Sequence, residues 1–217
     1  MKKEEVRARI LEIGIVPVVR ASSSSGARFA AEAVRKGGIP IVEITMTVPG
    51  ALGMISDLVR DMQDVLVGAG TVLDAEMARR CMDAGAQFLV SPGFDRETVE
   101  LAARENIVIM AGALTPTEVI TAWKAGSDFV KVFPCAQVGG ASYIKALKGP
   151  LPQVPLVPTG GVNLDTAASF ILAGAAALGV GGELIRKEAV HARQPEVIED
   201  LARKFLSAVS NAREQMP

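Results

Sequence analysis

Residues 115–133 read TPTEVITAWKAGSDFVKVF, and this stretch contains one complete unit of the predicted fold. It opens with Thr115-Pro116-Thr117-Glu118, which supplies an N-cap, a proline at the first helical position and a capping-box glutamate. Gly126 follows the helical pattern and stands just before the apolar run of residues 129–133. The stretch therefore predicts a helix that ends at a glycine and leads into a buried strand.

Similar units occur along the whole chain. Glycines comparable to Gly126 follow predicted helices at Gly37, Gly85 and Gly174, and the four are 48, 41 and 48 residues apart. This period is close to two strand–helix units. Between the predicted helices lie eight candidate strands, namely Val16–Arg20, Ile41–Thr45, Val65–Thr71, Phe88–Ser91, Ile107–Ala111, Phe129–Phe133, Leu156–Thr159 and Ala177–Gly181.

Eight strand–helix units with apolar, parallel-type strands predict one α/β domain over residues 1–217, a closed (β/α)₈ TIM barrel. An extra helix is expected at residues 3–13. The alternative is an open, doubly wound sheet. Such sheets usually have fewer strands, and the G-x-G-x-x-G turn that binds dinucleotides is absent after the first strand.

Composition excludes several classes of protein. Hydrophobic residues make up 49% of the chain and charged residues 22%, which is typical of a folded domain. The 23 basic and 24 acidic residues are finely mixed, so we expect no nucleic-acid partner. Apolar runs are too short to cross a membrane, and the first residues, Met1-Lys2-Lys3-Glu4-Glu5, lack the apolar segment of a secretory signal. We therefore expect a cytoplasmic protein without a membrane partner.

The rarest polar residues narrow the chemistry further. His191 is the single histidine and lies in a polar segment, where we interpret it as a surface residue. Cys81 and Cys135 have no metal-ligand spacing and are typical of a reducing compartment. Catalysis would therefore depend on Lys, Glu, Arg, hydroxyl groups and backbone amides.

Lys131 is the most unusual of these residues, because it lies at the centre of the apolar strand 129–133. A closed barrel has no edge strand where its ammonium group would be solvated. Burying an ammonium group costs several kcal/mol unless it is paired or loses its proton, and the deprotonated amine is a nucleophile. Spacing alone leaves both readings open, a nucleophile or a structural ion pair.

Glu43 is a second lone charge at the middle of a predicted strand, residues 41–45. Alternation along the strand places Glu43 and Thr45 on the same face. A buried glutamate here would be a general acid/base, a partner of Lys131, or both.

Other polar residues follow the strands, where the active site of a TIM barrel lies. Arg20 ends the first strand, where it would hold a carboxylate or be a surface charge. Thr71 ends the third strand and Ser91-Pro92-Gly93 the fourth. Thr159-Gly160-Gly161 and Gly179-Val180-Gly181-Gly182 follow strands seven and eight, where this fold commonly binds phosphate through backbone amides.

These residues carry a resemblance to a known family. Over nearly its whole length the chain resembles the 2-keto-3-deoxy-6-phosphogluconate (KDPG) and 4-hydroxy-2-oxoglutarate (KHG) aldolases. The matching segments are Val-Glu-Ile-Thr (42–45), Val-Gly-Ala-Gly-Thr-Val (67–72), Ser-Pro-Gly (91–93), Val-Lys-Val-Phe-Pro (130–134), Lys-Ala-Leu-Lys-Gly-Pro (145–150) and Val-Pro-Thr-Gly-Gly-Val (157–162).

The resemblance implies a lyase, a homotrimeric class I aldolase of carbohydrate metabolism in the Entner–Doudoroff pathway. Such an enzyme cleaves a small-molecule 2-keto acid to pyruvate and an aldehyde, with no metal and no cofactor. Lys131 would be the Schiff-base lysine and Glu43 the general acid/base. The substrate contacts that the resemblance implies are Arg20, Thr71, Pro92, Phe133, Gly160 and Gly161.

Two positions depart from the family pattern. Some members have an arginine for the pyruvate carboxylate where this chain has Thr47, and we expect Arg20 to replace it. Thr47 itself is still expected to be a substrate contact. Many members have a phosphate-binding serine in the last loop, where this chain has Gly182 followed by Glu183. The amides of Gly181 and Gly182 would then have to hold the phosphate, with Glu183 turned away as a first-turn helix residue.

Other functions remain open at this stage. A related pyruvate aldolase with a different aldehyde would use the same residues. A phosphosugar isomerase or epimerase would use Glu43 without a covalent step. A non-catalytic barrel that binds a sugar phosphate or a protein is the alternative from another class.

Overall fold

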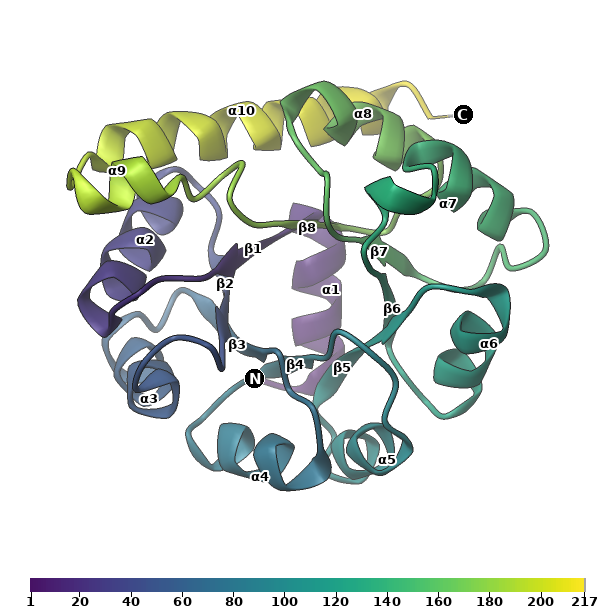
Figure 1. Cartoon of the computed structure of the whole chain (residues 1–217), viewed down its shortest axis with the longest axis horizontal. Helices are drawn as coiled ribbons and strands as arrows, with labels where there is room; N and C mark the ends of the chain where they lie inside the picture. Colours follow the sequence, from purple (N-terminus) through teal and green to yellow (C-terminus); the bar gives the residue numbers. More distant parts are fainter. Residues whose placement is uncertain (217) are drawn as a thin grey trace.

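The structure, a computed structural model, describes residues 1–216 and has eight parallel strands in the order β7-β6-β5-β4-β3-β2-β1-β8 (Figure 1). A bridge between Thr159 and Gly179 joins β7 to β8, so the sheet is a nearly closed barrel. The predicted (β/α)₈ fold is confirmed. The strands are β1 (Ile15–Val19), β2 (Ile41–Thr45), β3 (Leu66–Gly70), β4 (Phe88–Val90), β5 (Val108–Ala113), β6 (Phe129–Val132), β7 (Leu156–Pro158) and β8 (Leu178–Val180).

Helices surround the barrel (Figure 1). They are α1 (Lys3–Ile13), α2 (Ser24–Lys36), α3 (Ala51–Asp61), α4 (Ala75–Asp83), α5 (Arg96–Arg104), α6 (Pro116–Lys124), α7 (Ala141–Lys148), α8 (Leu164–Leu172), α9 (Lys187–His191) and α10 (Pro195–Glu214), with a 3₁₀ turn, η1, at Ala136–Val138.

The helix predicted at residues 3–13 is α1, and it covers one end of the barrel (Figure 1). Lys3 Nζ lies 2.9 Å from Asp128 Oδ2, and Asp128 immediately precedes β6. The covered end is therefore the amino end of the strands. The candidate site residues that follow the strands lie at the other end.

The capping signals of the sequence operate as predicted. The Glu118 side chain accepts a hydrogen bond from Thr115 N at 2.8 Å, and Thr115 Oγ1 accepts one from Glu118 N at 3.3 Å. Asp74, Asp95 and Asn163 each accept a hydrogen bond from the backbone of the helix that follows. Local chemistry thus sets where these helices begin.

The first helix stop lies one residue later than predicted. Gly85, Gly126 and Gly174 have φ values of 95°, 103° and 95°, whereas Gly37 is right-handed at φ −71° and Gly38 is left-handed at φ 96°. A Cβ on Gly37 would collide with Ala202 of α10. Gly37 is therefore a packing glycine, and Gly38 reverses the chain.

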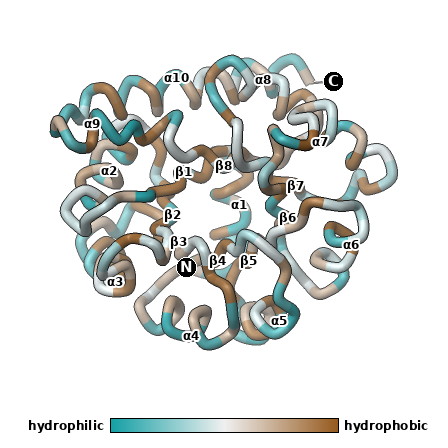
Figure 2. Tube along the Cα trace, in the orientation of Figure 1, coloured by the Kyte–Doolittle hydropathy of each residue, from teal (hydrophilic) through white to brown (hydrophobic). Residues whose placement is uncertain are grey.

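Hydropathy follows the barrel closely. Brown, hydrophobic segments mark the strands in Figure 2, and the outer helices alternate between brown and teal. Every strand residue is buried. Among residues 1–216, no helix combines the length and apolar character that a membrane span requires.

Several strands end one residue earlier than predicted. Arg20, Thr71 and Phe133 consequently lie just after β1, β3 and β6 rather than inside them. Their side chains are thereby available to the open end of the barrel.

Candidate active site

Lys131 lies on β6 with its side chain buried, and the residue is only 3% exposed. Its Nζ lies 5.5 Å from the centre of the Phe133 ring. Within residues 1–216 it forms no ion pair, so the alternative of a structural ion pair does not hold there. An amine in this setting is available to a ligand.

Glu43 lies on β2 and is 2% exposed. Its Oε1 has no hydrogen-bond partner among the described residues. Burial raises the pKa of the carboxyl group above its usual value, and the charges of Lys131 and then Arg20 partly offset the rise. The carboxyl group is therefore close enough to Lys131 and Arg20 for their charges to affect its pKa. Its Oε1 has no hydrogen-bond partner and is free for proton transfer.

Two glycines that sequence reasoning did not single out make room for Glu43 and for the loop at Pro92. A Cβ on Gly70 would overlap the Glu43 carboxyl group, and a Cβ on Gly112 would overlap the backbone of Pro92. Gly112 is the register partner of Lys131, and its N–H donates to Gly93 O at 3.0 Å. Pro92 is thus held beside the lysine strand. Glycine inside an otherwise apolar strand was the available signal, since it marks a close approach.

Thr45 and Thr47 connect the ends of the first two strands. The Thr45 hydroxyl lies 3.1 Å from Val19 O and 2.7 Å from Thr47 Oγ1. Thr47 itself is exposed and lies beside Arg20 in a pocket outside the barrel. The predicted substrate contact at Thr47 is therefore placed at the edge of the site.

Thr71 follows β3 with a φ of 60°. This left-handed conformation is unfavourable for a β-branched residue, and such strain is most common at functional positions. Its place beside Gly70 puts it at the open end of the barrel, as predicted.

The loops after β7 and β8 line a pocket of about 260 Å³. Arg20 and Phe133 reach it from β1 and β6. Gly160 and Gly161 have φ values of 87° and 78°, which suit glycine, and a Cβ on Gly161 would collide with Ala136. The other lining residues are Val18, Thr159, Val162, Gly179, Gly181, Gly182 and Glu183. The structure therefore brings the predicted glycine turns together with Arg20 and Phe133. The expectation that Glu183 is a first-turn helix residue turned away from the site is wrong, because Glu183 lies in a turn ahead of α9 and lines the same pocket.

Both cysteines are free and buried. Burial raises the pKa of both the Cys81 and the Cys135 thiols to about 11, which disfavours the reactive thiolate. Among residues 1–216, no three His, Cys, Asp or Glu side chains are grouped as a metal site would need.

Comparison with known proteins identifies the family. The sequence model described as KDPG and KHG aldolase matches residues 6–201. The chain belongs to this family. The resemblance seen in the sequence is therefore confirmed, and with it the assignment to the aldolases, which are lyases.

Individual family members are similar over most of their length. The 2-dehydro-3-deoxy-phosphogluconate aldolase of Treponema pallidum (strain Nichols) is 36% identical over 159 residues, covering 73% of this chain and 76% of that protein. The KDPG aldolase of Legionella pneumophila, with pyruvate captured at low pH as a covalent carbinolamine intermediate, superposes with a TM-score of 0.85 at 30% identity. That match covers 92% of this chain and 97% of the other.

A third similar structure is a cube-shaped, highly porous protein cage designed by fusing symmetric oligomeric domains. It has a TM-score of 0.86 at 30% identity, and the match covers 94% of this chain and 74% of that chain.

Proposed function

We propose that this protein is a class I aldolase that cleaves 2-dehydro-3-deoxy-6-phosphogluconate to pyruvate and glyceraldehyde 3-phosphate. It would also cleave 4-hydroxy-2-oxoglutarate to pyruvate and glyoxylate. The observation that carries the proposal is the buried, unpaired amine of Lys131 opposite the buried carboxyl group of Glu43. Similarity to aldolases of the same name supports the choice of substrate.

The reaction begins at Lys131. Its Nζ attacks the C2 carbonyl carbon of the keto acid, and loss of water leaves an iminium bond between C2 and Nζ. Lys131 is 3% exposed and forms no ion pair among residues 1–216, so no acidic side chain competes with the keto acid for its amine. The iminium then withdraws electrons from the C3–C4 bond.

Glu43 removes and returns a proton in the remaining steps. Its carboxylate removes the proton of the C4 hydroxyl, the C3–C4 bond breaks, and the electron pair moves through C3 to form an enamine with neutral nitrogen. The aldehyde leaves. The protonated Glu43 then returns a proton to C3, and water hydrolyses the iminium to pyruvate and free Lys131. A pKa above the usual carboxyl value suits a group that acts as base and acid in turn.

The neighbouring residues would hold the substrate. Arg20 would bind the C1 carboxylate through its guanidinium group. Some family members use an arginine for this purpose at the position of Thr47. Thr71 and Pro92 would border the keto acid, and Phe133 would exclude water from the lysine. Amides of Gly160, Gly161, Gly181 and Gly182 would hydrogen-bond the far end of the substrate.

The direct assay follows pyruvate release from 2-dehydro-3-deoxy-6-phosphogluconate by the full chain. Lys131→Met should abolish release, whereas Lys145→Met, which changes an exposed lysine of α7, should not. Absence of pyruvate with folded protein would overturn the proposed reaction. Pyruvate release that survives Lys131→Met would overturn the covalent mechanism.

A homotrimer in the cytoplasm completes the proposal. Family resemblance supports the trimer, and a similar chain serves as a symmetric oligomeric domain in a designed cage. The two free cysteines fit a reducing compartment. Light scattering coupled to size-exclusion chromatography should give three times the mass of one chain, and cell fractionation should recover the protein with cytoplasmic markers. A monomeric mass or a membrane-bound fraction would contradict these assignments.

A further inference from the structure

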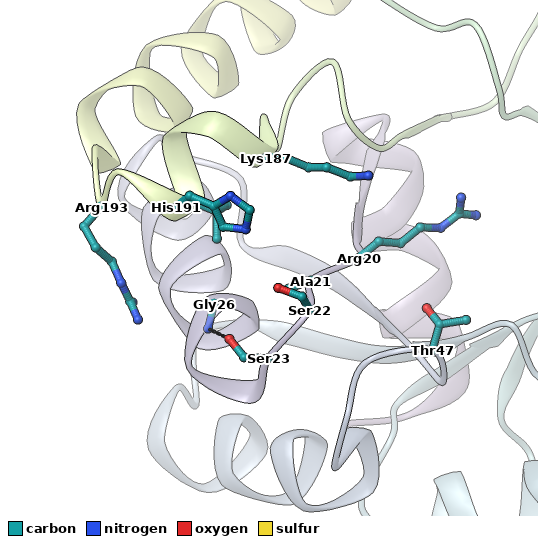
Figure 3. A pocket seen from close by; sticks show the side chains of 10 residues that line it. Arg20, Ala21, Ser22, Ser23, Gly26, Thr47, Lys187, His191 and Arg193 are labelled. Atoms are coloured by element: carbon teal, nitrogen blue, oxygen red, sulfur yellow. Dashed lines mark hydrogen bonds between the residues drawn. The ribbon is translucent and has the colours of Figure 1, made fainter.

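A second pocket lies outside the barrel mouth, between the loop after β1, the start of α2, and α9 (Figure 3). Its volume is about 440 Å³. Sites for small molecules usually measure about 300–1,000 Å³, so the pocket is large enough for a compound of sugar size. Apart from Arg20, the reaction described above assigns no role to its lining residues.

The pocket is lined by basic side chains from two parts of the chain. Arg20 comes from the end of β1, and Lys187, His191 and Arg193 come from α9 and the turn after it. No Asp or Glu is among its lining residues. Because the whole chain carries a formal net charge of −1, this cluster is a local concentration of positive charge rather than part of a generally basic surface.

Most of these groups have no partner within the protein. Among residues 1–216, Arg20, Lys187 and His191 make neither an ion pair nor a side-chain hydrogen bond. Arg193 is different, because it donates to Ser25 O at 3.3 Å and Ser25 Oγ at 3.2 Å. Three sets of donors are therefore free to bind an anion.

Figure 3 shows how the side chains are arranged. Arg20 and Lys187 extend in the same direction, whereas Arg193 points away from them. The Arg193 guanidinium stacks over Phe29 at 5.1 Å from the ring centre. Arg193 thus forms a fixed outer wall, and Arg20 and Lys187 are the cations placed to share one ligand.

Arg20 also belongs to the active site. It lines both this pocket and the 260 Å³ pocket at the glycine turns, and its charge lowers the pKa of Glu43. An anion bound beside Lys187 would therefore bind the same Arg20 guanidinium group that we propose for the carboxylate of the keto acid.

We propose that this pocket binds a small phosphate monoester of about sugar size, with its phosphate group at Arg20, Lys187 and His191, and that the bound compound competes with the keto acid for Arg20. A dianion suits a cluster of several cations better than a carboxylate does, because each cation forms a charge-assisted hydrogen bond with a different oxygen. The hydroxyl-bearing loop residues Ser22 and Ser23 give the rest of the wall a polar character. The competition, but not the binding, rests on the proposed function.

Calorimetric titration of the full chain with glycerol 3-phosphate tests the binding. Glycerol and glycerate serve as matched ligands that lack the phosphate. Loss of charged hydrogen bonds should weaken binding of glycerol 3-phosphate by about tenfold or more in the Lys187→Gln/His191→Gln double variant. Lys145→Gln, which changes an exposed lysine on α7, is the control and should bind like the wild type.

Two outcomes would overturn the proposed site. An unchanged Kd in the double variant would place the phosphate at the glycine turns instead. Glycerate that binds as tightly as glycerol 3-phosphate would show a general carboxylate site.

The competition is tested separately with the aldolase assay. Glycerol 3-phosphate should raise the KM for 4-hydroxy-2-oxoglutarate, which has no phosphate, and leave kcat unchanged. The double variant should lose most of this inhibition. Tight binding without any effect on KM would refute the competition while leaving the site in place. If the chain released no pyruvate at all, the reaction would be refuted, and the calorimetric result would still decide the site.

Discussion

Gly70 on β3 leaves the space that the Glu43 carboxyl group occupies on the neighbouring strand. The two strands are paired in register, with Thr45 opposite Gly70, and any Cβ at position 70 would overlap the Glu43 side chain. Glycine at position 70 therefore leaves room for the side chain that we propose as the acid/base group. It also explains why a carboxyl group can be so deeply buried in a barrel of this size.

The first prediction concerns this glycine. Gly70→Ala should force the Glu43 carboxyl group aside and lower kcat about a hundredfold, since a shift of 1 Å in a catalytic group can have that effect. Overpacking should also reduce the free energy of unfolding by about 1–3 kcal/mol. Steady-state kinetics and urea denaturation measure the two effects.

Gly53→Ala is the matched control for this substitution. Gly53 lies in α3, and a Cβ there meets no atom within 4 Å. Alanine at this helical position should leave kcat unchanged and stabilise the protein by about 0.5–1 kcal/mol. Normal turnover in Gly70→Ala would show that the carboxyl group does not depend on the position of this glycine.

The second prediction concerns Glu43 directly. Glu43→Gln should retain the fold and still form an adduct with pyruvate, because Lys131 supplies the covalent step. Turnover should fall by about two to four orders of magnitude, the usual contribution of a general acid/base. Near-normal turnover would mean that Glu43 only balances the charge of Lys131.

The third prediction is a pH dependence of stability. Because burial raises the pKa of Glu43 above 4.5, the folded protein keeps this proton at pH values where the unfolded chain has lost it. As pH rises from below 4.5 through the raised pKa, the wild type should therefore lose stability relative to Glu43→Gln. The difference between the free energies of unfolding of the two proteins should change by at most about 1.4 kcal/mol per pH unit. Urea denaturation of both proteins across this range measures it, and a difference that is flat or rises with pH would contradict the burial effect.

The fourth prediction concerns the far end of the substrate. Glu183 is exposed on the 260 Å³ pocket, where solvent screens its charge. The phosphorylated six-carbon keto acid should therefore be cleaved with a higher kcat/KM than 4-hydroxy-2-oxoglutarate. Glu183→Ser should improve that value about tenfold at most, since one neutral hydrogen bond contributes about 0.5–1.5 kcal/mol.

Kinetics with both substrates in both proteins decide this prediction. A preference for the unphosphorylated acid that Glu183→Ser reverses would show that the carboxylate faces the substrate. It would also show that the phosphorylated compound is not the main substrate of the wild type.

Sequence reasoning was most effective where local chemistry decides the structure. The capping box at Thr115 and Glu118 and the alternation around Lys131 and Glu43 depend only on neighbouring residues, and each is present in the structure. A charged residue at the centre of an apolar strand is buried in a closed barrel, because the barrel has no edge strand where the charge would be solvated. For that reason the burial of Lys131 and Glu43 was predictable without a structure.

Long-range packing could not be predicted in the same way. Gly37 has no room for a Cβ because α10 packs against it, and nothing near it in sequence indicates that contact. His191 was interpreted as an ordinary surface residue in a segment distant from the glycine turns. His191 is exposed, as interpreted, and the structure also places it with Arg20, which is 171 positions away in the chain, on one pocket.

The most direct test of the covalent mechanism is treatment of the full chain with pyruvate and borohydride, followed by peptide mass analysis. Borohydride reduces the iminium and traps the three-carbon unit on the lysine that formed it. We predict a single reduced adduct on the peptide containing Lys131, present in the wild type and in Glu43→Gln and absent in Lys131→Met. Folded wild-type protein without an adduct, or with an adduct on another lysine, would contradict the assignment of Lys131 as the Schiff-base residue.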